Sequence, residues 1–435
     1  MVRIFGIIFA GIITSFFYFP FPFRFFPVTN TKNILAGIGV GLFLCRMART
    51  QNGIIRRDFV ELTFWGIGVS LAGLLSLTIN DTQDYAYATY VRSMWIWISA
   101  AYVVVNVIRW VHGKISVPIL INYLLGVCVF QCIIAILIDN VDFVKDAVHT
   151  FLPPMDFMEN VNRLYGIGAS LDVGGSRFAA VLIMTAYIIA SIDFTIYKKY
   201  LVWYIWGAIV VSIIGNMIAR TTTAGLLLAG LLFFFRKWYV DKALFVISTK
   251  EVIRKIILIA VVILPIIIYL YNTNDVFRHD LRFAFEGFFN LFETGEWNVA
   301  SNNKLKTMYI WPDNFKTWLI GDGYFDNPFY LDPYYSGPNY DGYYKATDAG
   351  YLRFIYYFGM LGLTIFMLYM YRVYNVCVSK FQRYKLMFLF LLLLNFVVWI
   401  KVSTDIFLVF APFLLIEHLD ENVDDKVNIR NDNNI

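Results

Sequence analysis

The stretch SVPILINYLLGVCVFQCIIAILI, residues 116–138, contains no charged side chain. A helix of about 20 predominantly apolar residues is long enough to cross the hydrocarbon core of a bilayer. This stretch therefore predicts a membrane-spanning helix. The rest of the chain agrees, because 59% of its 435 residues are hydrophobic and only 15% are charged. Soluble domains carry about 25% charged residues, so the composition argues against an ordinary soluble protein.

Apolar segments of similar character recur along the whole chain. They predict an all-α polytopic integral membrane protein with about 12 transmembrane helices. The two pairs within 201–236 and 385–417 are expected to be tight hairpins. The predicted spans lie near residues 4–20, 33–48, 58–79, 92–111, 116–138, 178–197, 201–219, 222–236, 254–271, 350–373, 385–400 and 402–417.

Basic residues gather after every second predicted span. Because loops rich in Lys and Arg stay in the cytoplasm, this pattern predicts a cytoplasmic location for these loops and for both termini. The net charge of +5 is thus explained by topology, and no nucleic-acid partner is expected. The basic residues concerned are Arg46, Arg49, Arg56, Arg57, Arg109, Lys114, Lys198, Lys199, Arg236, Lys237, Lys242, Lys250, Arg254, Lys255, Arg372, Lys380, Arg383 and Lys385.

This orientation divides the chain into membrane and loop regions. Two long segments are predicted outside the cytoplasm, and a loop as long as the second is usually functional. A polar, acidic end is expected to be a disordered cytoplasmic tail. The predicted regions are 1–138 (helices 1–5), 139–177 (first extracytoplasmic loop), 178–271 (helices 6–9), 272–349 (large extracytoplasmic loop), 350–417 (helices 10–12) and 418–435 (tail).

Several basic residues lie on the predicted outer side, against the general trend. Arg220 occupies the short turn in GNMIARTTTAGLLLAG (215–230), and Arg177 precedes the span at 178–197. Arginine beside a membrane is costly, so each is either a functional residue or a contact to lipid headgroups. In FRHDLRF (277–283), Arg278 and Arg282 are four residues apart and would share one helix face. Two such guanidiniums suit a diphosphate.

Two lysines and two acids complete the predicted outer set. Lys304 and Lys306 would add positive charge for an anionic ligand, or form a solvated loop face. Asp322, in IGDGYF (320–325), and Asp348, in TDAGYLRFIYYFGMLG (347–362), are candidate general bases, because a low-dielectric boundary raises a carboxyl pKa. Asp348 could equally cap the following helix. Arg353 lies five residues further on and is placed to pair with Asp348.

The glycines of the last two stretches have separate expected roles. Gly321 and Gly323 predict a tight turn with positive φ. Gly359 and Gly362 lie inside a span, where they predict close helix approach. Neither pair belongs to a phosphate-binding loop.

The layout and several local stretches together resemble the O-antigen ligase/polymerase superfamily, in particular its Wzy-type polymerases. The stretch ARTTTAG (219–225) is similar to the short outer turn of that family, with Arg220 at the arginine place. FKTWLIGDGYF (315–325) is similar to its Gly-x-Gly stretch, and NRLYGIGASLDVGGSRFAAVL (162–182) to its first outer loop, where Arg163 and Gly166 fall. Ligases of the family carry a His where this chain has Asp348, so the resemblance favours a polymerase.

The resemblance implies a GT-C-like fold and a reaction at the outer face of the bacterial inner membrane. The donor would be an undecaprenyl-diphosphate-linked oligosaccharide, and the acceptor another lipid-linked repeat unit. The catalytic candidates are then Arg220, Asp348, Arg278, Arg282 and Asp322. The candidates for substrate binding are Arg163, Arg177, Lys304, Lys306 and Arg353.

In this reading the arginines stabilise the leaving lipid diphosphate. No cofactor and no metal are expected, and the further partners are membrane lipids and a chain-length regulator protein. The product would be O-antigen or capsule polysaccharide. A ligase-type transferase and a lipid-linked oligosaccharide flippase remain the alternatives.

Overall fold

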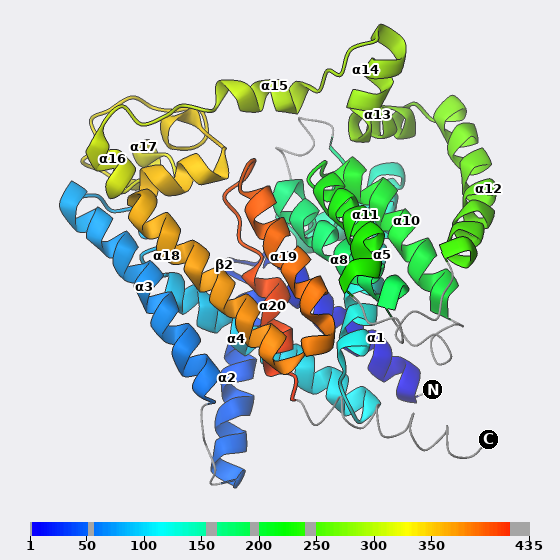
Figure 1. The fold of residues 1–435 in the computed structure, drawn as a ribbon, viewed down its shortest axis with the longest axis horizontal. Coiled ribbons are helices and arrows are strands. Elements are labelled where there is room, and N and C mark those ends of the chain that lie inside the picture. The colour runs from blue at the N-terminus through cyan, green and yellow to red at the C-terminus, as the bar shows by residue number, and fades with distance from the viewer. Residues whose placement is uncertain (1, 51–55, 154–162, 192–199, 240–248, 418–435) are drawn as a thin grey trace.

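A computed structural model of the chain describes residues 2–50, 56–153, 163–191, 200–239 and 249–417 (Figure 1). The predicted tail, part of the predicted first loop, and Lys198, Lys199 and Lys242 lie outside these residues. The fold is a helical assembly with one short antiparallel strand pair, β1 (Pro22–Phe23) with β2 (Phe26–Asn30).

Long helices form the body of the molecule. They are α1 (Val2–Tyr18), α2 (Thr31–Thr50), α3 (Arg57–Asn80), α4 (Tyr90–His112), α5 (Val117–Asn140), α8 (Leu171–Ser191), α10 (Leu201–Ile218), α11 (Thr222–Tyr239), α12 (Thr249–Thr273), α18 (Gly350–Lys380), α19 (Lys385–Val398) and α20 (Phe407–Leu415). Short helices lie between them: α6 (Asp142–Phe151), α13 (Asp275–Ala284), α14 (Glu286–Thr294), α15 (Ala300–Thr307), α16 (Phe315–Leu319), α17 (Pro328–Leu331), and the 3-10 turns Tyr344–Ala346 and Gln382–Tyr384.

The expectation of an all-α polytopic membrane protein is confirmed by the number of long apolar helices. Within the described ranges, eight helices are long and apolar enough to cross a membrane, namely α2, α3, α4, α5, α8, α10, α12 and α18. The apolar helices α1 and α11 are shorter. Every predicted span overlaps a helix, but the predicted number of crossings does not follow from these lengths.

The last two helices are shorter than the predicted spans 385–400 and 402–417. At 1.5 Å per residue, the nine residues of α20 extend about 14 Å, roughly half of a hydrocarbon core. The connector 399–406 is not helical, and its backbone is bonded by buried groups: Trp399 donates to the Thr404 carbonyl, and Asn395 accepts from the Ile406 N–H. Irregular backbone is tolerated at membrane depth where protein surrounds it, and α20 is itself buried from Phe407 to Leu414.

Helix α18 is broken inside the stretch that the sequence analysis singled out. Gly359 has φ +66° and ψ −174°, a conformation that is essentially restricted to glycine. A Cβ here would lie 2.3 Å from the carbonyl of Leu319 in α16, so the expected close approach at Gly359 is confirmed. At Gly362 a Cβ would instead meet the ring of Phe358 in the same helix.

The turn at 321–323 fills this break. Gly321 and Gly323 have φ of +89° and +78°, as predicted. The break exposes the carbonyls of Tyr356 and Tyr357, which accept hydrogen bonds from the N–H groups of Asp322 (2.6 Å) and Gly323 (3.2 Å). The loop 272–349 is thereby fixed to the top of α18.

The short helices α13–α17 form a layer on one side of the molecule, while the start of α1 lies on the opposite side (Figure 1). Helix α12 leads into this layer from the edge of the assembly. In the most apolar stretch of α12 only 6% of the residues are buried, against 83% in that of α8. Most of the α12 surface is therefore available for contact with lipid.

Candidate functional site

Arg220 lies in the turn between α10 and α11 and reaches into the loop layer. Its Nε donates to the Phe283 carbonyl (2.9 Å), and its Nη1 donates to the Ser301 hydroxyl (3.0 Å). The same Nη1 lies 2.7 Å from a carboxylate oxygen of Glu286. The side chain is only 15% exposed, so the guanidinium is held in place rather than extended toward headgroups.

A second guanidinium shares this location. Arg163 and Arg220 both lie over the ring of Phe283, with 5.0 and 4.0 Å between guanidinium carbon and ring centroid. Burial lowers the pKa of Arg220, Glu286 raises it, and the positive charge of Arg163 lowers it further. Two cations thus lie over one ring beside the Glu286 carboxylate, so the two guanidiniums are held close together despite their like charge.

Two residues connect Arg220 to the end of α19. Asp172, in the first turn of α8, accepts a hydrogen bond from the Thr221 hydroxyl beside Arg220. The same carboxylate oxygen lies 2.8 Å from the Lys401 ammonium, which the connector 399–406 supplies. The charge of Asp172 also acts on Arg220. Segments far apart in the sequence thus meet at one place on the loop side.

Asp348 is the carboxylate at the edge of this group. Within the described residues it makes no hydrogen bond and no ion pair. Burial raises its pKa to about 6, and Asp172 also raises it, while Arg353, Lys401 and Lys304 lower it. The capping alternative is wrong, because Ala349 is the N-cap of α18 and no side chain caps it.

These residues define what we call the loop-face cluster. It combines two guanidiniums, an ammonium and three carboxylates, of which Asp348 has a raised pKa, and Ser301 of α15 contacts Arg220 within it. Such a set can bind an anion and accept a proton from a neighbouring hydroxyl. Its members are Arg163, Asp172, Arg220, Glu286, Asp348 and Lys401.

Arg278 and Arg282 are not brought into the cluster. They lie on α13 four residues apart, as predicted, but each guanidinium has its own acid. Arg278 pairs with Asp275 at 2.9 Å, and Arg282 forms a two-pronged pair with Glu293 at 2.7 and 2.6 Å. Both ion pairs are local to α13 and α14, so neither guanidinium is directed toward Arg220.

Asp322 is engaged in the loop. Its carboxylate accepts hydrogen bonds from the Thr317 hydroxyl (2.6 Å) and the Tyr344 hydroxyl (3.2 Å), and Lys316 lies 3.8 Å away. With both oxygens occupied, it is better suited to holding the 321–323 turn than to accepting a proton.

Arg353 does not form the predicted ion pair with Asp348. Its buried guanidinium pairs with Asp326 at 2.8 Å, donates to the Phe325 carbonyl, and stacks between the rings of Phe325 and Tyr343 at 3.8 and 3.5 Å. Asp348 precedes the N-cap of α18 and so lies outside the helix, while the loop residue Asp326 takes the Arg353 guanidinium. Arg353 anchors the loop.

The remaining predicted basic residues are dispersed. Arg177 lies inside α8, which begins at Leu171 and so includes the end of the predicted first loop. It is 6% exposed and lies over the Phe19 ring, so it does not extend to headgroups. Lys304 and Lys306 are exposed on α15, and the charge of Lys304 acts on Asp348.

Sequence reasoning missed three members of the loop-face cluster: Asp172, Glu286 and Lys401. Lys401 carried a usable signal, because a lone lysine between two predicted spans on the outer side opposes the positive-inside trend. Asp172 and Glu286 carried no comparable signal. Their importance depends on contacts across residues distant in the chain.

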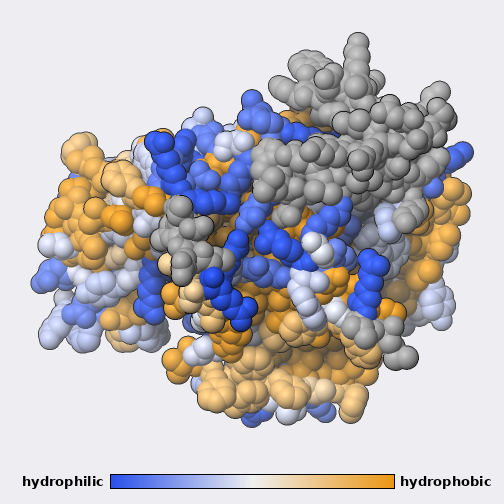
Figure 2. Space-filling view, turned by 90° about the horizontal axis from the view of Figure 1, so that it is seen from below, coloured by the Kyte–Doolittle hydropathy of each residue, from blue (hydrophilic) through white to orange (hydrophobic). Residues whose placement is uncertain are grey.

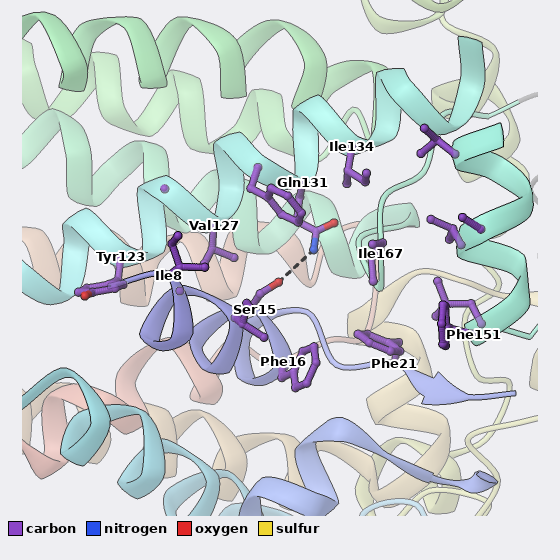
Figure 3. Close-up of a pocket in the computed structure, with 18 of the residues that line it drawn as sticks. Ile8, Ser15, Phe16, Phe21, Tyr123, Val127, Gln131, Ile134, Phe151 and Ile167 are labelled. Atoms are coloured by element: carbon purple, nitrogen blue, oxygen red, sulfur yellow. Dashed lines mark hydrogen bonds between the residues drawn. The ribbon is translucent and has the colours of Figure 1, made fainter. Parts of the chain in front are cut away.

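A large apolar groove lies elsewhere, between α1, α5 and α6, with a volume of about 890 Å³. Figure 3 shows Ile8, Phe16, Val127 and Ile134 lining it and the hydrogen bond from Gln131 to Ser15 crossing it. Its apolar lining suits a lipid chain, and it has none of the charged groups of the cluster.

Comparisons with known protein families, with characterised proteins and with solved structures find no match.

Proposed function

We propose that this protein is a membrane glycosyltransferase that joins lipid-diphosphate-linked oligosaccharide repeat units into a surface polysaccharide, either O-antigen or capsule. One observation carries this proposal. In the loop-face cluster, the charge of Asp172 acts both on the half-buried Asp348 carboxylate, which has no hydrogen-bond partner among the described residues, and on Arg220, which shares the Phe283 ring with Arg163. A transferase that releases a diphosphate needs both a proton acceptor and fixed cations.

The proposed step uses the cluster as follows. An acceptor hydroxyl attacks the anomeric carbon of the donor, and its proton passes to the Asp348 carboxylate. The bond between the anomeric carbon and the phosphate oxygen breaks, and the lipid diphosphate leaves with the electron pair. Arg163 and Arg220 stabilise the charge that develops on it. Burial and the charges of Arg353, Asp172, Lys401 and Lys304 set the electrostatic environment of Asp348.

The two arginines over Phe283 also favour a diphosphate over a neutral ligand. Guanidinium groups bind phosphate oxygens in a fork geometry. Glu286 occupies one arm of Arg220 in the present arrangement. An arriving diphosphate would displace this carboxylate, so the pair would hold Arg220 in position until the donor binds.

The membrane arrangement in this proposal has about 12 crossings, a GT-C-like organisation and the loop 272–349 outside. Both termini are in the cytoplasm, and the location is the bacterial inner membrane. The partners are the undecaprenyl-diphosphate-linked oligosaccharide, membrane lipids and a chain-length regulator. The reaction is metal-independent, without a cofactor.

The test uses purified protein in nanodiscs with lipid-linked repeat units from the native host. Nucleotide sugars are left out and EDTA is present. A ladder of glycan lengths on a gel is expected from the wild type and not from Asp348→Asn.

The alternatives give other results in the same experiment. Transfer of one preformed glycan to a different acceptor, without a ladder, would indicate a ligase. Movement of lipid-linked units between leaflets of a proteoliposome, with no new glycosidic bond, would indicate a flippase and contradict the proposal.

A further inference from the structure

A cavity of about 290 Å³ lies on the side of the molecule away from α13–α17. It is formed where α2 and α4 end, where α3 begins, and where α20 ends. Three arginines from three different segments line it, namely Arg46, Arg56 and Arg109, and they are accompanied by Tyr102 and Asn106. Figure 2 shows hydrophilic residues gathered across the middle of this side, with hydrophobic residues on the flanks.

The cavity has more positive than negative charge. Among the residues that the structure describes, Glu417 is the one acid that lines the cavity, and it lies 3.7 Å from Arg46. Asp58 lies 3.9 Å from Arg56. Arg46 interacts with Tyr102 as well as with Glu417, whereas the distance between Arg56 and Asp58 exceeds the 2.7–2.9 Å typical of a hydrogen-bonded ion pair. Arg56 donates through Nη2 to the Leu414 carbonyl, but its buried Nε atom has no hydrogen-bond partner, so one of its donors is unused.

The walls of the cavity are apolar. Val40, Phe43, Phe59, Trp95 and Ile98 lie on the sides facing the helices. An inorganic anion would bind to the arginines but would make no favourable contact with these apolar side chains. A ligand that carries both a phosphate and hydrocarbon would use both.

The depth of the cavity fits a lipid headgroup. Arg109 lies in the last turn of α4, Arg46 lies one turn before the end of α2, and Arg56 directly precedes α3. All three therefore lie at helix ends, where a membrane helix passes from hydrocarbon to the polar interface. Basic pockets between membrane helices at this level bind anionic headgroups.

We propose that this cavity is a binding site for an acidic phospholipid. The phosphate lies between Arg46, Arg56 and Arg109, and an acyl chain lies along Phe43 and Trp95. The site is on the opposite side of the molecule from the loop-face cluster. It does not depend on the proposed transferase activity.

The test measures co-purified and added lipid by native mass spectrometry on the full chain. Phosphatidylglycerol is compared with phosphatidylcholine at equal concentration. We expect preferential binding of phosphatidylglycerol, and about tenfold weaker binding in Arg109→Gln, because a hydrogen bond to a charged group contributes about 1.5 kcal/mol or more. Arg46→Gln provides a second variant should Arg109→Gln fail to fold. Arg254→Gln, on exposed α12, is the matched control and should bind as the wild type does.

Three results would overturn the proposal. Equal binding of the two lipids, or unchanged binding in both pocket variants, would show that the arginines do not recognise a headgroup. Full displacement of the lipid by inorganic phosphate would make a free anion the ligand. If the preference for phosphatidylglycerol appeared only after residues 418–435 were removed, the acidic segment 418–435 would be the occupant of the cavity in place of a lipid.

Discussion

The pH dependence of the reaction offers a sharp prediction about Asp348. A general base works in its ionised form, so activity should fall as pH falls through its pKa of about 6. About 97% of such a carboxyl is ionised at pH 7.5 and about 9% at pH 5, which predicts a roughly tenfold loss of single-turnover rate. An aspartate of ordinary pKa near 3.9 would remain about 93% ionised at pH 5.

Substitution of the charged neighbours of Asp348 should shift the pH profile in a direction that depends on the charge removed. A purely structural effect of these substitutions would not produce such opposite shifts. Asp172 raises the Asp348 pKa and Lys401 lowers it. Asp172→Asn should therefore move the acidic limb of the pH profile to lower pH, and Lys401→Met should move it to higher pH. The assay is single-turnover ladder formation between pH 5 and 8, with chain integrity checked at each pH by size-exclusion elution.

A flat profile from pH 7.5 to 5 would refute the assignment of Asp348 as the base. So would an Asp348→Asn variant that retains the wild-type rate. A limb that moves in the same direction in both neighbour variants would show that the electrostatic reasoning is wrong.

Three further predictions concern the loop and its attachment. Gly359→Ala should lower the thermal unfolding midpoint in detergent, because the backbone conformation alone costs about 1–3 kcal/mol and the new Cβ would clash with the carbonyl of Leu319 in α16. The control is Gly230→Ala, which has open space around it and should leave the midpoint unchanged or slightly higher. Asp84→Ala should make residues 321–331 sensitive to limited proteolysis. The buried Asp84 carboxylate accepts hydrogen bonds from the N–H groups of Phe325 (2.7 Å) and Asp326 (2.9 Å), and each group left unsatisfied costs about 1–3 kcal/mol. Resistance equal to that of the wild type would contradict this. Arg282→Gln should keep near wild-type polymerisation, because its ion pair is local to α13 and α14, whereas a complete loss would return this arginine to the active site.

The positions of the helices could be predicted from the sequence because apolar run length is a local property. Each predicted span overlaps a helix, and the turn at Gly321–Gly323 has the predicted backbone. The shortness of α20 could not be predicted. Its run of apolar residues continues to 416, and only the surrounding protein permits the irregular connector before it.

The site was partly predictable for a different reason. An arginine in a very short outer turn is conspicuous in a sequence, and Arg220 does lie in a charged cluster. The compensation of Arg278 by Asp275 and of Arg282 by Glu293 depends on where the acids point, which the spacing of the arginines does not determine. Arg353 illustrates the same limit, since its partner Asp326 comes from the loop and not from its own helix.

The most direct test of the central claim compares Arg220 with Arg278, two arginines that the sequence analysis named alike as catalytic candidates. Release of lipid diphosphate from a defined donor, in the presence of acceptor, is measured in single-turnover reactions of wild type, Arg220→Gln and Arg278→Gln. The account predicts that Arg220→Gln lowers the rate about 100-fold or more, as loss of a transition-state donor does, while Arg278→Gln stays close to wild type. Equal rates for Arg220→Gln and the wild type, or a larger loss in Arg278→Gln, would contradict the loop-face cluster as the catalytic centre.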